Sequence, residues 1–187
     1  MISGLILVLA ASSLTAYNTW DEKRADDVLN KVLDELDSFD GLNAFEGEEN
    51  PEPETDMPIL TLDSGTYIGI LEIPVLGLRL PVMQEWNYSK LKISPCRYTG
   101  SAYTNDMVVA AHNYRSHFGT LDRLQPGDDI LFIDMHGNRF HYKVAETEKV
   151  MPTEIEYMIT GDWDLTLFTC TFGGRARVTV RCNFDLN

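Results

Sequence analysis

A cysteine and an arginine flank a glycine turn near the C-terminus, in the stretch LTLFTCTFGGRARVTV at residues 165–180. If Gly173-Gly174 forms a two-residue hairpin loop, Cys170 lies directly opposite Arg177. Opposite residues of a sheet share one face, with Cβ atoms about 4.5–5.5 Å apart. The guanidinium would then favour the thiolate and donate to the oxyanion that forms when sulfur attacks a carbonyl. The pattern predicts a nucleophilic cysteine beside a fixed positive charge.

A reactive cysteine also needs a base, and without one Cys170 would be a small buried apolar residue, as most free cysteines are. His112 ends the apolar run MVVAAH, just as Cys170 ends LTLFTC. If these two strands are parallel neighbours, both side chains emerge at the same end of the sheet. His117, in the loop that follows, is a second candidate. His136, in a turn, and His141, on a polar strand face, are expected to be solvated.

Short strand-like runs separated by turn residues make up the chain from residue 58 onward, which indicates an all-β barrel or sandwich. Helical turns are expected only near residues 86–91 and 118–124. A chain of 187 residues fits one domain with short extensions. The expected strands are residues 67–73, 78–83, 107–112, 129–134, 139–146, 165–170 and 177–184.

The first twenty residues contain no charged side chain. As a helix they would rise about 30 Å, the thickness of the hydrocarbon core of a bilayer. We therefore interpret residues 1–20 as a membrane anchor, with a cleaved signal segment or a buried helix as alternatives. Either of the first two interpretations places the following domain outside the cytoplasm.

Residues 21–40 are expected to form an amphipathic helix whose apolar stripe packs on the body of the protein or on a partner. Residues 41–57 combine six acidic residues with prolines and glycines, which is typical of a flexible acidic linker. Because residues 1–57 contain no candidate catalytic group, we expect them to be dispensable for chemistry on soluble peptides. The apolar stripe consists of Val28, Leu29, Val32, Leu33, Leu36 and Phe39.

The net charge of −14 belongs mostly to the N-terminal part of the chain. Residues 1–57 carry 14 acidic and 3 basic residues, and residues 58–187 carry 15 and 12. No basic stripe is available for phosphate backbones, so nucleic acid is excluded as the main partner. The three cysteines are too scattered for a metal knuckle, and a disulfide between Cys96 and Cys182 stays open.

Three motifs together resemble the sortase family, the cysteine transpeptidases of Gram-positive cell surfaces. The family's TLxTC signature stands as TLFTC at residues 166–170. Its histidine follows a strand in VVAAHN at 108–113, and its arginine opens the last strand in RVTVR at 177–181. The motifs occur in the family's order, and the resemblance covers roughly residues 65–184.

The resemblance implies a closed eight-stranded β-barrel with short helices, preceded by an N-terminal helical segment, as a catalytic domain at residues 58–187. Cys170 would attack the Thr–Gly bond of an LPxTG-type sorting motif, His112 would act as acid and base, and Arg177 would hold substrate and oxyanion. An amine of a peptidoglycan precursor would then resolve the thioacyl enzyme. The partners implied are surface proteins with sorting signals, and the location implied is the cell membrane, with the catalytic domain outside.

Further site residues follow from the same resemblance. Thr169 and Asn113 would line the substrate groove, and the backbone N–H of Thr171 would complete an oxyanion hole. No cofactor or metal is expected, because the acidic residues between 146 and 156 lack the ligand spacing of an EF-hand.

A feature of the sequence bears on the subclass: HN at residues 112–113, followed by FGTL at residues 118–121, is similar to the corresponding segment of class B sortases. The pilus-building class usually carries an aspartate-proline-aromatic lid and a second, C-terminal membrane segment, and the sequence shows neither. We therefore favour anchoring of proteins to the cell wall over pilus assembly.

Two other functions stay open at this point. The domain could be a membrane-tethered, non-catalytic barrel that binds peptides or wall components, or a cysteine peptidase that mainly hydrolyses. A ligated product that depends on Cys170 would exclude the non-catalytic barrel. The ratio of aminolysis to hydrolysis distinguishes a transpeptidase from a peptidase.

Overall fold

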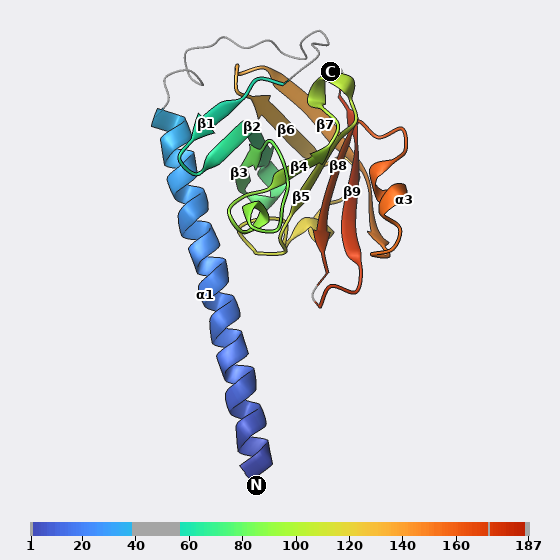
Figure 1. Cartoon of the computed structure of the whole chain (residues 1–187). Helices are drawn as coiled ribbons and strands as arrows, with labels where there is room; N and C mark the ends of the chain where they lie inside the picture. The colour runs from blue at the N-terminus through green and yellow to red at the C-terminus, as the bar shows by residue number, and fades with distance from the viewer. Residues whose placement is uncertain (1, 39–56, 172, 186–187) are drawn as a thin grey trace.

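The strands of this chain form one sheet that closes on itself (Figure 1). This computed structural model describes residues 2–38, 57–171 and 173–185. Within them the strand order is β1-β2-β3-β4-β5-β8-β9-β7-β6, and β2 also pairs with β6. That additional pairing joins the two ends of the run from β2 to β6. Eight strands therefore form a closed barrel, as expected, and β1 pairs with β2 outside the ring.

The strands are β1 (Leu60–Leu62), β2 (Gly65–Ile73), β3 (Leu78–Met83), β4 (Cys96–Thr99), β5 (Met107–Ala111), β6 (Asp129–Asp134), β7 (Arg139–Val150), β8 (Leu165–Cys170) and β9 (Arg177–Phe184). The α-helices are α1 (Ile2–Ser38) and α3 (Ile155–Ile159), and the 3₁₀ turns are η1 (Pro74–Leu76), η2 (Lys90–Lys92), η3 (Ala102–Thr104) and η4 (Leu121–Arg123).

All seven strands expected from the sequence are present, and the parallel pairing of β5 with β8 is confirmed. Ala111 lies opposite Thr169 in that ladder, so the residues that follow emerge together. Both strands are central in the sheet, and their side chains are almost entirely buried. Continuous apolar runs of this kind suit strands that are covered on both faces.

Five short elements were not expected: β1, β4, α3 and the 3₁₀ turns η1 and η3. Strand β4 joins β3 through a single parallel pair, Met83 with Cys96, and joins β5 antiparallel. Helix α3 has five residues, fewer than a helix needs to be stable by itself. Elements this short depend on contacts with distant parts of the chain, which local sequence patterns do not report.

Helix α1 is continuous from Ile2 to Ser38 and therefore spans both the segment interpreted as an anchor and the expected amphipathic helix. Its second half lies against the barrel, where Ala25, Leu29, Val32 and Leu36 are buried. Both Nη atoms of Arg79, on β3, donate to the carboxylate of Asp37 at 2.8 and 3.0 Å. The apolar stripe from Val28 to Leu36 therefore packs on the body of the protein, and Phe39 lies outside the described residues.

This packing argues against treating residues 21–38 as dispensable. Leu29 belongs to the same buried cluster as residues of β2, β5 and β8, and Val32 and Leu36 belong to a second cluster with Tyr67 and Met83. Of the expected acidic linker, only Met57 lies within the described residues, and it is buried in the first cluster.

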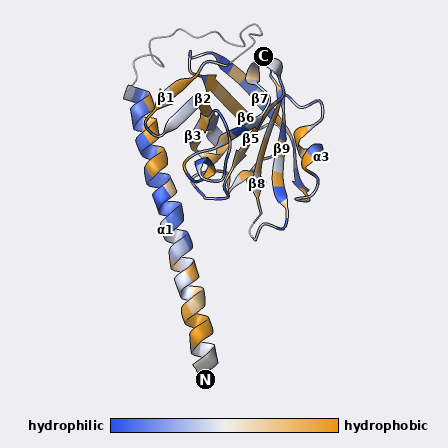
Figure 2. Ribbon diagram, viewed as in Figure 1, coloured by the Kyte–Doolittle hydropathy of each residue, from blue (hydrophilic) through white to orange (hydrophobic). Residues whose placement is uncertain are grey.

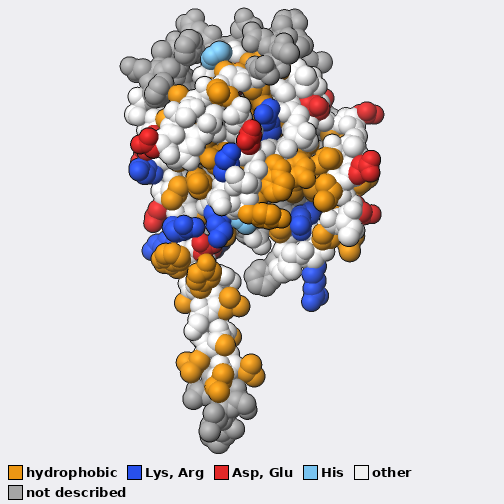
Figure 3. All heavy atoms as spheres, viewed as in Figure 1, with side chains coloured by type: hydrophobic (Ala, Val, Ile, Leu, Met, Phe, Trp, Pro, Cys, Tyr) orange, Lys and Arg blue, Asp and Glu red, His pale blue; other side chains and the backbone are white. Residues whose placement is uncertain are grey.

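The first half of α1 projects from the barrel and carries apolar side chains that the barrel does not cover (Figures 2 and 3). Its large exposed apolar residues are Ile6, Leu7, Val8, Leu9, Leu14, Tyr17 and Trp20. Among the described residues, no helix combines the length and mean hydropathy of a membrane-spanning helix.

The three cysteines are free thiols. Cys96 and Cys182 are buried in different clusters, so the disulfide that the sequence left open is not formed. Burial raises the pKa of Cys96 to about 12 and raises that of Cys182 as well. Both thiols are therefore protonated at neutral pH, and Cys170 is the one of the three that is partly exposed.

Candidate active site

The hairpin between β8 and β9 has the expected register, with Cys170 directly opposite Arg177. The turn itself is wider than the two-residue loop expected. Both strands end at this pair, the N–H of Gly174 donates to the carbonyl of Thr171 at 2.8 Å, and Gly173 and Gly174 have φ values of +81° and +70°. A wider loop that is centred on the same two glycines preserves the register, which is why the pairing was predicted correctly.

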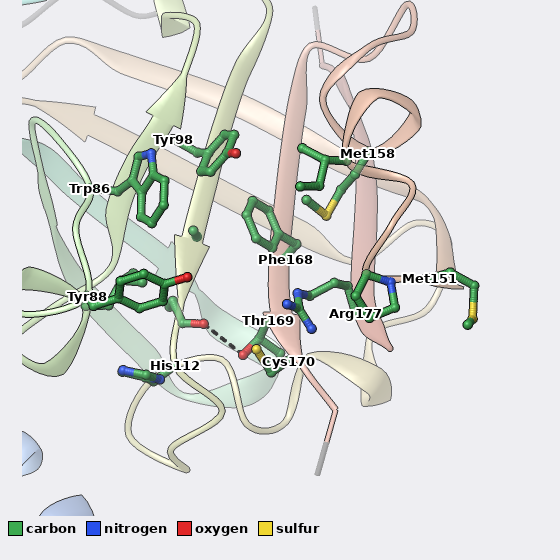
Figure 4. A pocket seen from close by; sticks show the side chains of 15 residues that line it. Trp86, Tyr88, Tyr98, His112, Met151, Met158, Phe168, Thr169, Cys170 and Arg177 are labelled. Carbon is green, nitrogen blue, oxygen red and sulfur yellow. Dashed lines mark hydrogen bonds between the residues drawn. The ribbon is translucent and has the colours of Figure 1, made fainter. Parts of the chain in front are cut away.

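His112 follows β5 and lies at the same end of the barrel as Cys170 (Figure 4). Its side chain is half-buried, and burial lowers its pKa while the nearby carboxylate of Asp21 acts in the opposite direction. The buried Nε2 atom has no hydrogen-bond partner in the described part of the chain. The imidazole is therefore poised to be neutral near pH 7, as a proton acceptor must be.

His117, the second candidate base, is fully buried. Burial lowers its pKa to about 4, and neither ring nitrogen has a hydrogen-bond partner among the described residues. An imidazole in this setting stays neutral and is shielded from solvent. The geometry therefore favours His112 for proton transfer.

The loop that carries both histidines is compact. The N–H of Phe118 donates to the carbonyl of His112 at 3.1 Å, and the N–H of Gly119 donates to Tyr114 at 2.8 Å. A Cβ on Gly119 would lie 2.6 Å from the carbonyl oxygen of Asn113, so only glycine fits this approach. These contacts thus fix the backbone position of His112.

Arg177 is half-exposed and lines a groove together with Cys170 and His112 (Figure 4). Its Nη1 atom lies 3.2 Å from the carbonyl of Ala176 and 3.4 Å from that of Gly174. These backbone contacts orient the guanidinium. A thiol, an imidazole and a guanidinium in one groove can perform acyl transfer from a peptide or an ester.

The groove beside Cys170 is apolar and has a volume of about 160 Å³. A row of aromatic rings forms one wall: Trp86 stacks on Tyr98 with centroids 5.1 Å apart, and Tyr98 meets Phe168 edge-on at 5.4 Å. Tyr88 packs edge-on against Trp86 at 5.8 Å. The other wall comes from the segment around α3 and includes Met151, Ile155 and Met158. On the face seen in Figure 3, apolar side chains gather beside α3.

None of these groove residues was singled out from the sequence. A usable signal was the aromatic pair in WNY at residues 86–88, which follows a strand without being needed for its core. The α3 wall had no such signal, because five residues in a connecting segment define no helical periodicity.

A buried cation holds the α3 wall in place. Arg181, on β9, is 1% exposed and forms an ion pair with Glu148 at 3.0 Å. It also donates to the carbonyls of Met158 at 2.7 Å and Tyr157 at 2.9 Å. The short helix is thus attached to the barrel through its backbone carbonyls.

A second hollow, of about 410 Å³ and more polar, also borders Cys170. It is lined by Asn113, Phe118, Gly119, Asp122, Lys149, Thr169, Cys170, Thr171 and Val178. Cys170 and Thr169 line both hollows. The Cys170 thiol therefore borders both the apolar groove and the polar hollow.

The three expected substrate-binding residues fit this arrangement to different degrees. Asn113 is exposed at the polar hollow. Thr169 is buried, and its hydroxyl donates to the carbonyl of Ala111 at 2.8 Å, which links β8 to β5. The N–H of Thr171 donates to Ala176 at 2.9 Å inside the hairpin, so an oxyanion role would require that bond to open.

Comparisons with known proteins agree with one another. A family model described as a sortase domain matches residues 71–185. The crystal structure of sortase C1 from Streptococcus agalactiae is 26% identical, with a TM-score of 0.57 over 65% of this chain and 68% of that chain. A Clostridium perfringens sortase D5 transpeptidase is 20% identical, with a TM-score of 0.56 over 64% and 79%.

A pilus-related sortase C of Group B Streptococcus is 20% identical, with a TM-score of 0.57 over 89% of this chain and 96% of that one. No match was found among curated proteins. The similarities at 20% identity concern the fold alone, and the class B resemblance in the sequence stays a prediction.

Proposed function

Since this chain belongs to the sortase family of cysteine transpeptidases, we propose that it cleaves an LPxTG-type sorting motif and transfers the acyl part to an amine of the cell wall. The observation that supports this most strongly is the position of Cys170, which lies opposite Arg177 and on the strand parallel to β5, the strand that His112 follows. Each group has the chemistry that one step of the transfer requires.

In the first half-reaction, the Cys170 sulfur attacks the carbonyl carbon of the Thr–Gly bond, and its proton passes to His112. The oxyanion on the tetrahedral intermediate accepts a hydrogen bond from the guanidinium of Arg177. The C–N bond then breaks as His112 returns the proton to the leaving glycine amine. The product is a thioester between the threonine carbonyl and Cys170.

In the second half-reaction, an amine attacks the thioester carbon and gives a proton to His112. The C–S bond breaks, a new amide forms, and the thiol is restored when that proton returns to sulfur. The aromatic groove suits the apolar residues of the sorting motif, and the polar hollow suits the approach of the amine. Because Cys170 lines both, the two substrates need not compete for one surface.

We place the domain at a membrane surface, with the catalytic barrel outside the cell, and assign the projecting half of α1 to this attachment. Support comes from its row of uncovered apolar side chains, which end at Tyr17 and Trp20. Aromatic residues at the end of an apolar segment are typical of a membrane–water interface.

A fluorogenic LPxTG-type peptide with an added amine tests the proposed reaction. The enzyme should yield a ligated product, detected by mass spectrometry, that depends on Cys170. Peptide binding without turnover would indicate a non-catalytic barrel. Hydrolysis that an amine does not divert into ligation would indicate a peptidase.

A further inference from the structure

Helix α1 reaches the loop that carries His112. The hydroxyl of Tyr114 donates to the carboxylate of Asp21 at 2.6 Å, and the backbone N–H of Arg115 donates to Glu22 at 2.6 Å. These contacts join residues 93 positions apart in the chain. They lie just where the helix leaves the barrel, one turn before its first buried residue, Ala25.

Tyr114 packs between the two imidazoles of this loop. Its ring centroid lies 4.9 Å from that of His112 and 5.4 Å from that of His117. Since the buried Nε2 of His112 has no hydrogen-bond partner in the described part of the chain, the ring is not oriented by a bond at that atom. The tilted Tyr114 ring, at 37° to the imidazole, is thus a contact that can restrain the orientation of His112.

The carboxylate of Asp21 is held ionised at this position. The hydrogen bond from Tyr114 lowers the pKa of Asp21, and Arg24 pairs with it at 3.2 Å. The charge acts on His112 as well, raising the pKa of a group whose burial lowers it, while Lys92 acts in the same direction as burial. The charged and titratable groups that act on His112 or contact it are Asp21 on α1, Lys92 on η2, and Tyr114 and His117 on its own loop. Arg24 pairs with Asp21, and Cys170 on β8 lines the same groove as His112.

We propose that Tyr114, held in place by Asp21, is a positioning residue for His112, and that helix α1 is therefore a working part of the active site. This inference rests on the proposed function, because it takes His112 as the acid and base of acyl transfer. The helix does not contact the substrate. It holds the Tyr114 ring that packs against the His112 imidazole, and its Asp21 carboxylate places a negative charge near that imidazole when it is protonated.

The test uses the full chain with four substitutions: Asp21→Asn, Tyr114→Phe, Tyr114→Ala and the control Asp27→Asn. Asp27 is an exposed carboxylate further along the same helix. Single-turnover acylation by an LPxTG-type peptide, steady-state KM, the thermal unfolding midpoint and the NMR titration of the His112 imidazole are measured for each protein.

We expect Asp21→Asn and Tyr114→Phe to slow acylation by about fivefold or more, with KM within about twofold, since misplacing a reacting group affects the rate of the chemical step. Tyr114→Ala should be slower still. The pKa of His112 should fall in Asp21→Asn, because a neighbouring negative charge is lost, and should change little in Tyr114→Phe. Asp27→Asn should match the wild type in every readout.

Wild-type acylation rates in folded Asp21→Asn and Tyr114→Phe proteins would overturn the inference and leave the proposed function standing. Acylation is also measured for a fifth variant, His112→Ala. A wild-type rate in that variant would instead overturn the assignment of His112, and the positioning role would fall with it. The two failures are thus distinguished by whether His112→Ala itself acylates.

Discussion

Cys170 and Arg177 lie directly opposite each other across the β8–β9 ladder, at its last pair before the turn. Arg175 lies two residues nearer the turn, outside the ladder and exposed. Side chains two apart on an extended segment point to the same face, so direction alone does not separate the two arginines. The strand register distinguishes them, because it pairs Cys170 with Arg177 and so places the Arg177 guanidinium beside the thiol.

Arg177→Ala should therefore lower kcat/KM by roughly 10² or more, the scale on which one oxyanion donor matters. Arg177→Lys should also be poor, because an ammonium lacks the planar fork of the guanidinium. Arg175→Ala is the matched control and should lose less than about tenfold. Steady-state assays of the three variants decide the matter, and the reverse order for the two alanine variants would contradict the assignment.

The buried cation Arg181 gives a prediction about stability and substrate binding together. Removing one partner of a buried ion pair costs about 3–5 kcal/mol, so Arg181→Ala should lower the free energy of unfolding by that amount. Because Arg181 holds the carbonyls of Tyr157 and Met158, KM for the peptide should also rise as the α3 wall loosens.

Denaturant unfolding and peptide kinetics check both parts, with the exposed Arg123→Ala as control. An Arg181→Ala protein with wild-type stability would show that the ion pair and its carbonyl contacts do not stabilise the fold.

The fully buried His117 predicts a stability loss in mild acid. Its pKa is about 4 in the folded protein against 6.5 for the ordinary value, so the unfolded chain binds more protons between these pH values. Stability should fall as pH drops through 6.5 and the loss should be complete near pH 4, at about 3 kcal/mol from this group.

His117→Phe removes the titrating group while filling the site. The difference in unfolding free energy between pH 7 and pH 4.5 should be smaller in this variant than in the wild type. Equal differences in the two proteins would mean that His117 is accessible to protons in the folded state.

The two halves of α1 should behave differently when removed. Deletion of residues 1–18 should leave activity on a soluble peptide within about twofold, since residues 2–18 project from the barrel (Figure 1). Deletion of residues 1–57 should lower the thermal unfolding midpoint. It removes Leu29, Val32 and Leu36 and so exposes the apolar surface of the barrel against which they pack. Each buried aliphatic side chain of this kind contributes about 1.5–3 kcal/mol.

Both truncated proteins are compared with the full chain in thermal unfolding and peptide assays. A fully stable and active barrel from residue 58 onward would restore the view that the whole N-terminal part is dispensable.

The sequence was most informative where chemistry and periodicity coincide. Two apolar runs that end in His112 and Cys170 predicted neighbouring parallel strands, and the position of two glycines predicted the pairing with Arg177. These features are local, or depend on strand ends alone. The exact turn differed, but a loop widened evenly about the same glycines left the register unchanged.

The groove walls and the contacts of α1 depend on tertiary packing instead. Tyr98, on which Trp86 stacks, contacts Phe168 only once the barrel has closed. Helix α3 forms a wall because Arg181 binds the carbonyl of Met158. His117 was a second candidate base in a loop, and nothing in its sequence neighbours reveals that the side chain is fully buried. Such burial is decided by residues far away in the chain.

Intact-protein mass spectrometry of the full chain, incubated with an LPxTG-type peptide in the absence of an amine, tests the central claim most directly. We predict a mass increase equal to the acyl part of the peptide, located on Cys170 by peptide mapping, retained in Cys96→Ala and absent in Cys170→Ala. The latter substitution removes little volume and should leave the fold intact. An acyl adduct that persists in Cys170→Ala, or one located on another residue, would contradict the account.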